Sequence, residues 1–237
     1  MISTNRLLST LPPEDRQRIV SQLTTIPLKF KQVLLKQDGP ILDVYFPGGG
    51  ACSLTKSMED GATAEVGTIG NEGMIGSSVF FGDVQSHTEA IVQVEGDKGY
   101  KMPVAAFLGE MERRGAFYNR VIRYHQALAI QIQQTTACNA LHPAEQRCCR
   151  WLLMTRDRVA TDELKLTHEF LAIMLGVRRP TVTLIVGSLE KAGLITNGHR
   201  GAIVITDRKK LEAASCECYA TVKANFARLL PDMPATG

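Results

Sequence analysis

The sequence lacks the segments that would place it in or across a membrane. No apolar run among its 237 residues approaches the roughly 18 to 20 residues needed to span a bilayer. The first residues, MISTNRLLSTLPPEDRQ, contain neither the long apolar core nor the small-residue cleavage site of a secretory leader. By elimination, we expect a cytoplasmic protein with no membrane partner.

Metal-binding spacings are scarce as well. The six cysteines include no CxxC pair and no His/Cys array spaced as in zinc sites. Cys216 and Cys218 are the one suggestive pair, but two thiols supply too few ligands for a strongly bonded metal. We therefore predict no metal and mostly reduced, structural thiols, with redox sensing as the alternative.

Signatures of catalysis are also missing. No phosphate loop and no dinucleotide fingerprint occurs. His87 beside Asp83 or Glu89, and His125 beside Tyr124, could be imagined as acid–base pairs. Because no nucleophile, base and orienting group share a catalytic spacing, we predict neither an enzyme nor a cofactor.

Charge is unevenly spread along the chain. The net charge is +3, but residues 145–210 contain 12 basic and 7 acidic side chains, whereas residues 1–144 contain 13 and 14. A basic segment beside a near-neutral one is typical of a domain that faces phosphates. The contrast is modest, because small domains often differ by this much.

The pattern of apolar residues changes near residue 102. Between 26 and 102, short β-prone runs such as ILDVYF, GMIGSSVFF and EAIVQV alternate with turn sequences such as PGGG and GNEG. Many short strands at near-regular spacing indicate an antiparallel roll, sandwich or barrel. Helical patterns occupy 12–22, 103–113, 116–140 and 143–158, so the predicted fold class is α+β.

The helix predicted over 116–140 has an apolar seam in steps of four and three. Its members are Phe117, Val121, Tyr124 and Leu128, continued by Gln131 and Thr135. Such a seam suits a two-helix coiled contact, and packing on the chain's own β-domain is the alternative. Since about 25 helical residues span about 37 Å, more than one small β-domain covers, we favour dimerisation.

The stretch from Glu163 to Ile195 contains two helical patterns joined by a tight corner. Thr167 can cap the first helix with its hydroxyl, and Gly176 tolerates the left-handed geometry of a helix–turn–helix corner. Pro180 suits the first turn of the second helix. The expected buried faces are Leu171, Met174 and Leu175, then Val182, Ile185, Val186 and Leu189.

Two adjacent arginines occupy that corner. Arg178 and Arg179 would project from the N-terminal end of the second helix, the end that enters a DNA major groove in this motif. An arginine there can donate two parallel hydrogen bonds to guanine, and Thr181 and Thr183 can reach phosphates or a thymine methyl group. The alternative is an ordinary solvated corner.

A hairpin signal favours DNA binding over that alternative. Residues 197–201 have turn chemistry and are followed by the β-prone run AIVI. A helix–turn–helix followed by a small β-hairpin is a winged helix, in which Arg200 at the tip could contact the DNA backbone.

The order of these parts resembles that of CRP/FNR-type bacterial transcription regulators. The most specific motifs are LTHEFLAIMLGVRRPTVTLIVGSLEKAGLI and the tail LEAASCECY, and the resemblance covers roughly residues 12–219. It implies a cyclic-nucleotide-binding-like β-roll with flanking helices over 1–115, a dimerisation helix and hinge over 116–141, and a winged helix with a C-terminal helix over 142–237. The implied partners are double-stranded DNA with a near-palindromic site, a second copy of the chain, and RNA polymerase.

Residue by residue, the resemblance makes Arg179 the guanine reader, Thr181 a neighbouring contact and Thr167 a phosphate contact. Pro180 and Leu184 stand where relatives commonly have glutamate and arginine. We therefore expect a DNA half-site different from that of the cyclic-AMP regulator.

The predicted roll departs from the family's nucleotide pocket. Members that bind cyclic nucleotides use a Gly-Glu pair for the ribose and an Arg-Ser pair for the phosphate. The corresponding candidate effector pocket here consists of Gly76, Ser77, Ser78, His87 and Thr88. Because a neutral histidine cannot replace a bidentate guanidinium and Glu89 would repel an anion, we expect that cyclic AMP is not the effector.

The prediction is thus a homodimeric, sequence-specific transcription regulator with a diverged sensor pocket and an unidentified small-molecule effector. The first cysteine, Cys52, lies inside the predicted roll, whereas the iron–sulfur sensors of the family carry an N-terminal cysteine cluster, so we expect no oxygen-labile cluster. A cyclic-nucleotide-responsive regulator with non-standard contacts is one alternative, and a thiol-based redox sensor is another.

Overall fold

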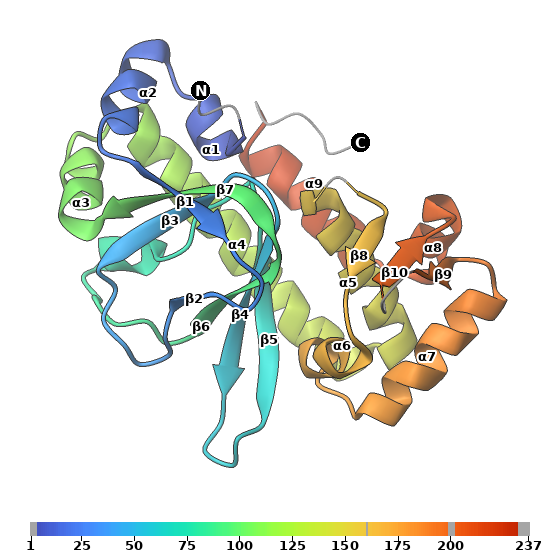
Figure 1. The fold of residues 1–237 in the computed structure, drawn as a ribbon. Coiled ribbons are helices and arrows are strands. Elements are labelled where there is room, and N and C mark those ends of the chain that lie inside the picture. The colour runs from blue at the N-terminus through green and yellow to red at the C-terminus, as the bar shows by residue number, and fades with distance from the viewer. Residues whose placement is uncertain (1–3, 160, 199–201, 232–237) are drawn as a thin grey trace.

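A computed structural model describes residues 4–159, 161–198 and 202–231 (Figure 1). The helices are α1 (Arg6–Ser9), α2 (Pro13–Val20), α3 (Val104–Glu112), α4 (Ala116–Leu141), α5 (Ala144–Val159), α6 (His168–Leu175), α7 (Arg179–Lys191), α8 (Arg208–Ala214) and α9 (Cys218–Leu229), with a 3-10 helix η1 (Ser77–Phe81). The strands are β1 (Thr24–Leu28), β2 (Val33–Leu35), β3 (Asp43–Pro47), β4 (Ala51–Ser57), β5 (Thr63–Ile69), β6 (Glu89–Val94), β7 (Gly96–Pro103), β8 (Glu163–Lys165), β9 (Ile195–Asn197) and β10 (Ala202–Ile205). The predicted α+β class is confirmed.

The N-terminal half is a roll of two antiparallel sheets, ordered β1–β7–β3 and β2–β6–β4–β5. Alternation along the strands fills its core: in β3, Val44 and Phe46 are fully buried, while Tyr45 between them is only partly buried. One predicted strand is wrong. Within the run GMIGSSVFF, Ile75 forms only an isolated bridge with Tyr45, and Ser77–Phe81 form η1. Gly76 and Gly82 on either side of η1 adopt left-handed backbone conformations, with φ of 87° and 90°, that end strand geometry.

The seam predicted on α4 faces inward. Phe117, Val121, Tyr124 and Leu128 are 0–7% exposed and belong to the core of the chain's own roll. The Tyr124 hydroxyl donates a hydrogen bond to the carbonyl of Met74 at 2.9 Å. The prediction that these four residues form a dimer seam is therefore wrong, and the alternative, that the seam packs on the chain's own β-domain, is the one observed.

The length argument failed because α4 has several neighbours rather than one. Beyond the roll, its inward face is covered by α5 and α9 (Figure 1). Gln131 donates to the Thr68 carbonyl of β5 at 2.9 Å, and Thr135 accepts from Arg150 of α5 at 3.1 Å. The buried face of α4 therefore continues past the roll within one chain.

The C-terminal half contains the predicted winged helix. Strands β8, β10 and β9 form a three-stranded antiparallel sheet in that order, and α6 and α7 meet at a bend of 104°. The residues predicted for the two buried helix faces are 0–6% exposed: Leu171, Met174, Leu175, Val182, Ile185, Val186 and Leu189. No single described helix is long and apolar enough to cross a membrane, and the bent pair α6–α7 meets the length and composition test only when both helices are counted together.

The two halves are joined by a buried polar contact between α5 and the roll. Trp151 Nε1 donates to the Glu65 carboxylate at 3.0 and 3.2 Å, and Arg158 forms an ion pair with Glu72 at 2.8 Å. These side chains are 2–9% exposed. Burial raises the pKa of Glu65, although the hydrogen bonds that its carboxylate accepts act in the opposite direction.

Candidate nucleic-acid interface and effector region

The first helix of the helix–turn–helix begins and ends as its sequence predicts. The Thr167 hydroxyl accepts a hydrogen bond from the Phe170 N–H at 3.2 Å and so caps α6. Gly176 follows the helix with φ 60° and ψ 39°, a left-handed conformation that turns the chain toward α7. The corner is therefore built by local interactions.

A long-range contact that sequence reasoning missed secures the same corner. Arg147 of α5 donates through Nη1 to the carbonyl of Leu175, the last residue of α6, at 2.8 Å. A cation at a helix C-terminus satisfies free carbonyls and is favoured by the helix dipole. The only sequence signal was the general preference for basic residues near helix ends, which cannot identify a partner 28 positions away.

The two corner arginines point to solvent. Arg178 is the N-cap residue of α7, Arg179 begins the helix, and Pro180 lies in its first turn as predicted. Both arginines are exposed, and neither forms an ion pair with any residue that the structure describes. Two free guanidinium groups at the positive end of a helix dipole make this corner suitable for binding an anion.

The two threonines of α7 differ in their surroundings. Thr181 is partly buried, whereas Thr183 is exposed. The Thr183 hydroxyl lies 3.3 Å from the Arg179 carbonyl oxygen and 3.1 Å from His168 Nδ1. Sequence reasoning did not include His168, which follows the cap residue Thr167 and shares this surface with Thr183. Leu184, next to it, is 76% exposed.

The wing forms beside this surface. Ile203 pairs with Asn197 and Ile205 with Ile195 in the β9–β10 hairpin. Arg200, predicted at its tip, lies outside the described residues. The hairpin itself is confirmed.

The candidate effector residues divide into two groups with different partners. Gly76, Ser77 and Ser78 begin η1, and the buried Ser77 hydroxyl lies 3.2 Å from His125 Nδ1 on α4. His87, in contrast, is on an exposed loop, where its Nε2 lies 2.6 Å from a carboxylate oxygen of Asp83. Thr88 is partly buried, and its carbonyl accepts from Ser86 at 2.7 Å.

The imagined acid–base pairs have structural partners instead. Asp83 accepts a backbone hydrogen bond from Gln85, which together with His87 lowers its pKa. His125 contacts the ring of Phe81, with centroids 4.6 Å apart, and burial lowers its pKa. Both histidines thus have local packing or turn interactions.

Known structures share this arrangement. The chain is similar to a CRP/FNR-family transcriptional regulator from Eubacterium rectale, with a TM-score of 0.66 and 20% identity over 88% of this chain and 97% of the other. It is also similar to the c-di-GMP-responsive regulator CLP of Xanthomonas campestris (0.66, 12%, 83% and 100%) and to FixK2 of Bradyrhizobium japonicum (0.61, 18%, 82% and 98%). The fold is that of the CRP/FNR class of transcription regulators.

A family model narrows this assignment in the C-terminal half. Residues 146–214 match the Crp-like helix-turn-helix domain. The segment that contains the α6–α7 corner thus belongs to the Crp-like helix-turn-helix family. No curated protein matches the sequence closely enough to count as a relative.

Proposed function

We propose that the chain is a homodimeric transcription regulator that reads DNA with the corner formed by Arg178 and Arg179. The observation that carries this proposal is that both guanidinium groups are exposed and without an ion-pair partner in the described chain, at the start of α7 in a Crp-like helix-turn-helix domain. Arg179 is the proposed guanine reader, with Thr167, Thr181 and Thr183 as neighbouring contacts. The protein works in the cytoplasm beside RNA polymerase and without catalytic chemistry.

Comparing binding of two arginine variants to base-substituted sites tests the reading role. Arg179→Ala should relax the preference at one base pair, because it removes a bidentate contact that contributes about 1–3 kcal/mol of discrimination. Arg200→Ala should weaken binding to all sequences alike, as loss of a phosphate contact does. The site itself would first be selected from random DNA. Equal losses across all base-substituted sites for both variants would contradict the assignment.

The dimer seam that we propose is a second strip on α4, in which most members directly follow a residue of the buried seam. Its members also follow steps of four and three and are partly buried or exposed in the single chain: Tyr118, Ile122, His125, Ala129, Ile132 and Thr136. Phe81, 60% exposed and packed on His125, widens this apolar strip. A parallel pair of α4 helices would bury the strip and direct two α7 corners toward successive half-sites of a near-palindrome.

A charge on the strip should separate the two copies. We expect Ile122→Glu to convert a dimer to a monomer in sedimentation velocity, because a buried unpaired carboxylate opposes association. Arg123→Gln, on an exposed neighbour, changes the charge by the same amount and should leave the dimer intact. A wild-type monomer, or dissociation in both variants, would refute this seam.

For the roll, we propose a sensor that does not bind cyclic AMP. Support comes from His87, which is paired with Asp83 on an exposed loop and so offers no guanidinium-like grip on a phosphate. Calorimetry should show absent or millimolar binding of cyclic AMP, whereas micromolar binding that improves DNA affinity would favour the cyclic-nucleotide-responsive alternative. The hydrogen bond between Ser77 and His125 would carry a change at η1 directly to α4.

The proposed division of labour follows the domains predicted from sequence. Residues 1–115 sense, 116–141 pair the two copies and 142–237 bind DNA.

A further inference from the structure

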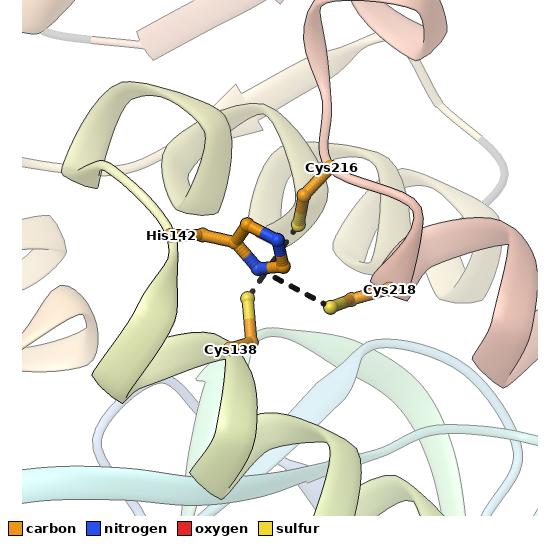
Figure 2. Close-up of side chains that lie close together, drawn as sticks. All are labelled: Cys138, His142, Cys216 and Cys218. Carbon is orange, nitrogen blue, oxygen red and sulfur yellow. Dashed lines mark hydrogen bonds between the residues drawn. The ribbon is translucent and has the colours of Figure 1, made fainter.

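Four side chains that the DNA interface does not use converge where α4 ends (Figure 2). Cys138 lies in the last turn of α4, and His142 is the residue that follows this helix. Cys216 lies in the connection between α8 and α9, and Cys218 is the first residue of α9. One ligand atom from each side chain lies within 4.8 Å of all the others.

The cluster is sheltered from solvent and made of soft ligands. Cys138, Cys216 and Cys218 are 0–4% exposed and form a small core of their own, while His142 is 20% exposed at its side chain. A groove of about 430 Å³ along α8 and α9, lined in part by Cys216 and Glu217, gives a path from solvent. Thiolate and imidazole ligands favour zinc and its chemical relatives over magnesium or calcium.

The spacing fits a single ion. Cys138 Sγ and Cys216 Sγ are 3.5 Å apart, and so are Cys218 Sγ and His142 Nδ1. A tetrahedral zinc ion with Zn–S of about 2.3 Å and Zn–N of about 2.0 Å separates its ligands by roughly 3.5–3.8 Å. An iron–sulfur cluster interposes several atoms between its thiolates and needs a wider ring.

The surrounding polar groups prepare the histidine to bind a metal. His142 Nε2 lies 3.2 Å from the Glu217 carboxylate. A proton on Nε2 would be donated to this carboxylate, and the lone pair of Nδ1 would then face the thiols. A carboxylate behind a histidine in this way is the usual companion of a metal-bound imidazole. Gln134 Nε2 also donates to Cys218 Sγ at 3.1 Å, which orients this sulfur.

A buried positive charge is matched to the cluster. Arg150 is 4% exposed and has no ion-pair partner among residues 4–159, 161–198 and 202–231. Its guanidinium acts electrostatically on the Cys138 thiol. Three thiolates, a neutral imidazole and a divalent ion together carry one negative charge, which Arg150 would balance.

We propose that Cys138, His142, Cys216 and Cys218 bind one zinc-class divalent ion in a closed, tetrahedral, structural site. Four protein ligands leave no open coordination position, so the ion does not act on a substrate. Because two ligands come from the end of α4 and two from the start of α9, the ion fastens the hinge after α4 to the C-terminal helix. The sequence predicted no metal, because its ligands are separated by 74 positions between His142 and Cys216.

Metal analysis of the full chain tests the proposal. Protein purified under reducing conditions from zinc-supplemented cells should contain one zinc per chain, and replacement by Co²⁺ should give the visible bands of tetrahedral thiolate-bound cobalt. Cys138→Ser and His142→Ala should lose the stoichiometric metal and the bands. Cys148→Ser, at a buried thiol outside the cluster, is the matched control and should retain both.

Glu217→Gln keeps the test independent of folding, because the Glu217 side chain is 72% exposed. It should weaken zinc affinity about 10- to 100-fold without removing a ligand. A folded chain that binds no zinc in competition with a chromogenic chelator would overturn the proposal. So would a Cys138–Cys216 disulfide in the purified protein, or iron with acid-labile sulfide in place of zinc. None of these readouts involves DNA, so failure here leaves the proposed regulatory function standing.

Discussion

Arg158 and Arg179 place the same side chain in opposite surroundings. Arg158 is 9% exposed, paired with Glu72, and also donates to the Gln131 side chain at 3.1 Å. Arg179 is exposed and has no ion-pair partner in the described chain. A guanidinium enclosed by acceptors fixes the position of its domain, whereas one left in water keeps its donors for a ligand. The α5–roll junction therefore fixes the winged helix on the roll, and the α7 corner keeps the free donors that the proposed DNA contact requires.

The largest effect should follow from breaking the junction. Arg158→Met leaves the Glu72 carboxylate buried without its closest cation, a change that typically costs about 3–5 kcal/mol. Since Arg6 also acts electrostatically on Glu72, we expect the lower end, about 3 kcal/mol. Urea unfolding should show a lower midpoint.

The double variant Glu72→Gln with Arg158→Met is the control. A neutral pair removes the buried unpaired charge, and so it should recover at least half of the lost unfolding free energy. A loss below about 1 kcal/mol in the single variant would show that the junction is open in solution.

Substitutions at the α7 corner should change DNA affinity and leave the unfolding free energy nearly unchanged. Arg178→Ala combined with Arg179→Ala should change the unfolding free energy by no more than about 0.5 kcal/mol, because exposed side chains without partners contribute little to folding. Specific DNA affinity should fall at least about 5-fold, corresponding to 1 kcal/mol or more. Arg16→Ala, on α2 far from the corner in sequence, removes an exposed positive charge elsewhere and should leave DNA affinity unchanged. Unfolding of the double variant would show that these arginines stabilise the fold, as Arg158 does at the junction.

Glu65 should give the smallest and most selective effect. Its pKa is raised by burial, so the folded chain holds this proton more tightly than the unfolded chain does. The resulting stabilisation is complete below the ordinary carboxyl pKa of 4.5 and is lost as pH rises through the raised value. Glu65→Gln keeps an acceptor for Trp151 and should flatten this part of the pH dependence of the unfolding free energy. An unchanged pH profile would show that the pKa of Glu65 is the same in the folded and unfolded chain.

The sequence predicted the geometry of the helix–turn–helix well because its signals are local. Thr167, Gly176 and Pro180 each act within one turn of their own position, so cap, corner and helix start can be inferred from the residues alone. The β-roll was predictable from strand spacing, apart from η1, where two positive-φ glycines override a β-prone composition.

The predictions that failed concern contacts between segments that are distant in the sequence. The inward seam of α4 has the same four-and-three spacing as a dimer seam, and only the positions of the roll, α5 and α9 decide which face is free. Arg147, which holds the end of α6, and the cysteine cluster are invisible for the same reason. A pattern within one helix predicts a buried face, but not its partner.

Helix α9 has a consequence for how the protein can be divided. Leu230, just after α9, lies in the same core as Leu7 and Leu8 of α1, and Phe226 touches the cores of both halves. The first and last segments of the described chain thus pack against each other in one core. A cut after α4 would remove Leu230 from the core of the roll and would expose the apolar face of α9 in the winged-helix fragment. Neither fragment is therefore expected to fold as it does in the intact chain.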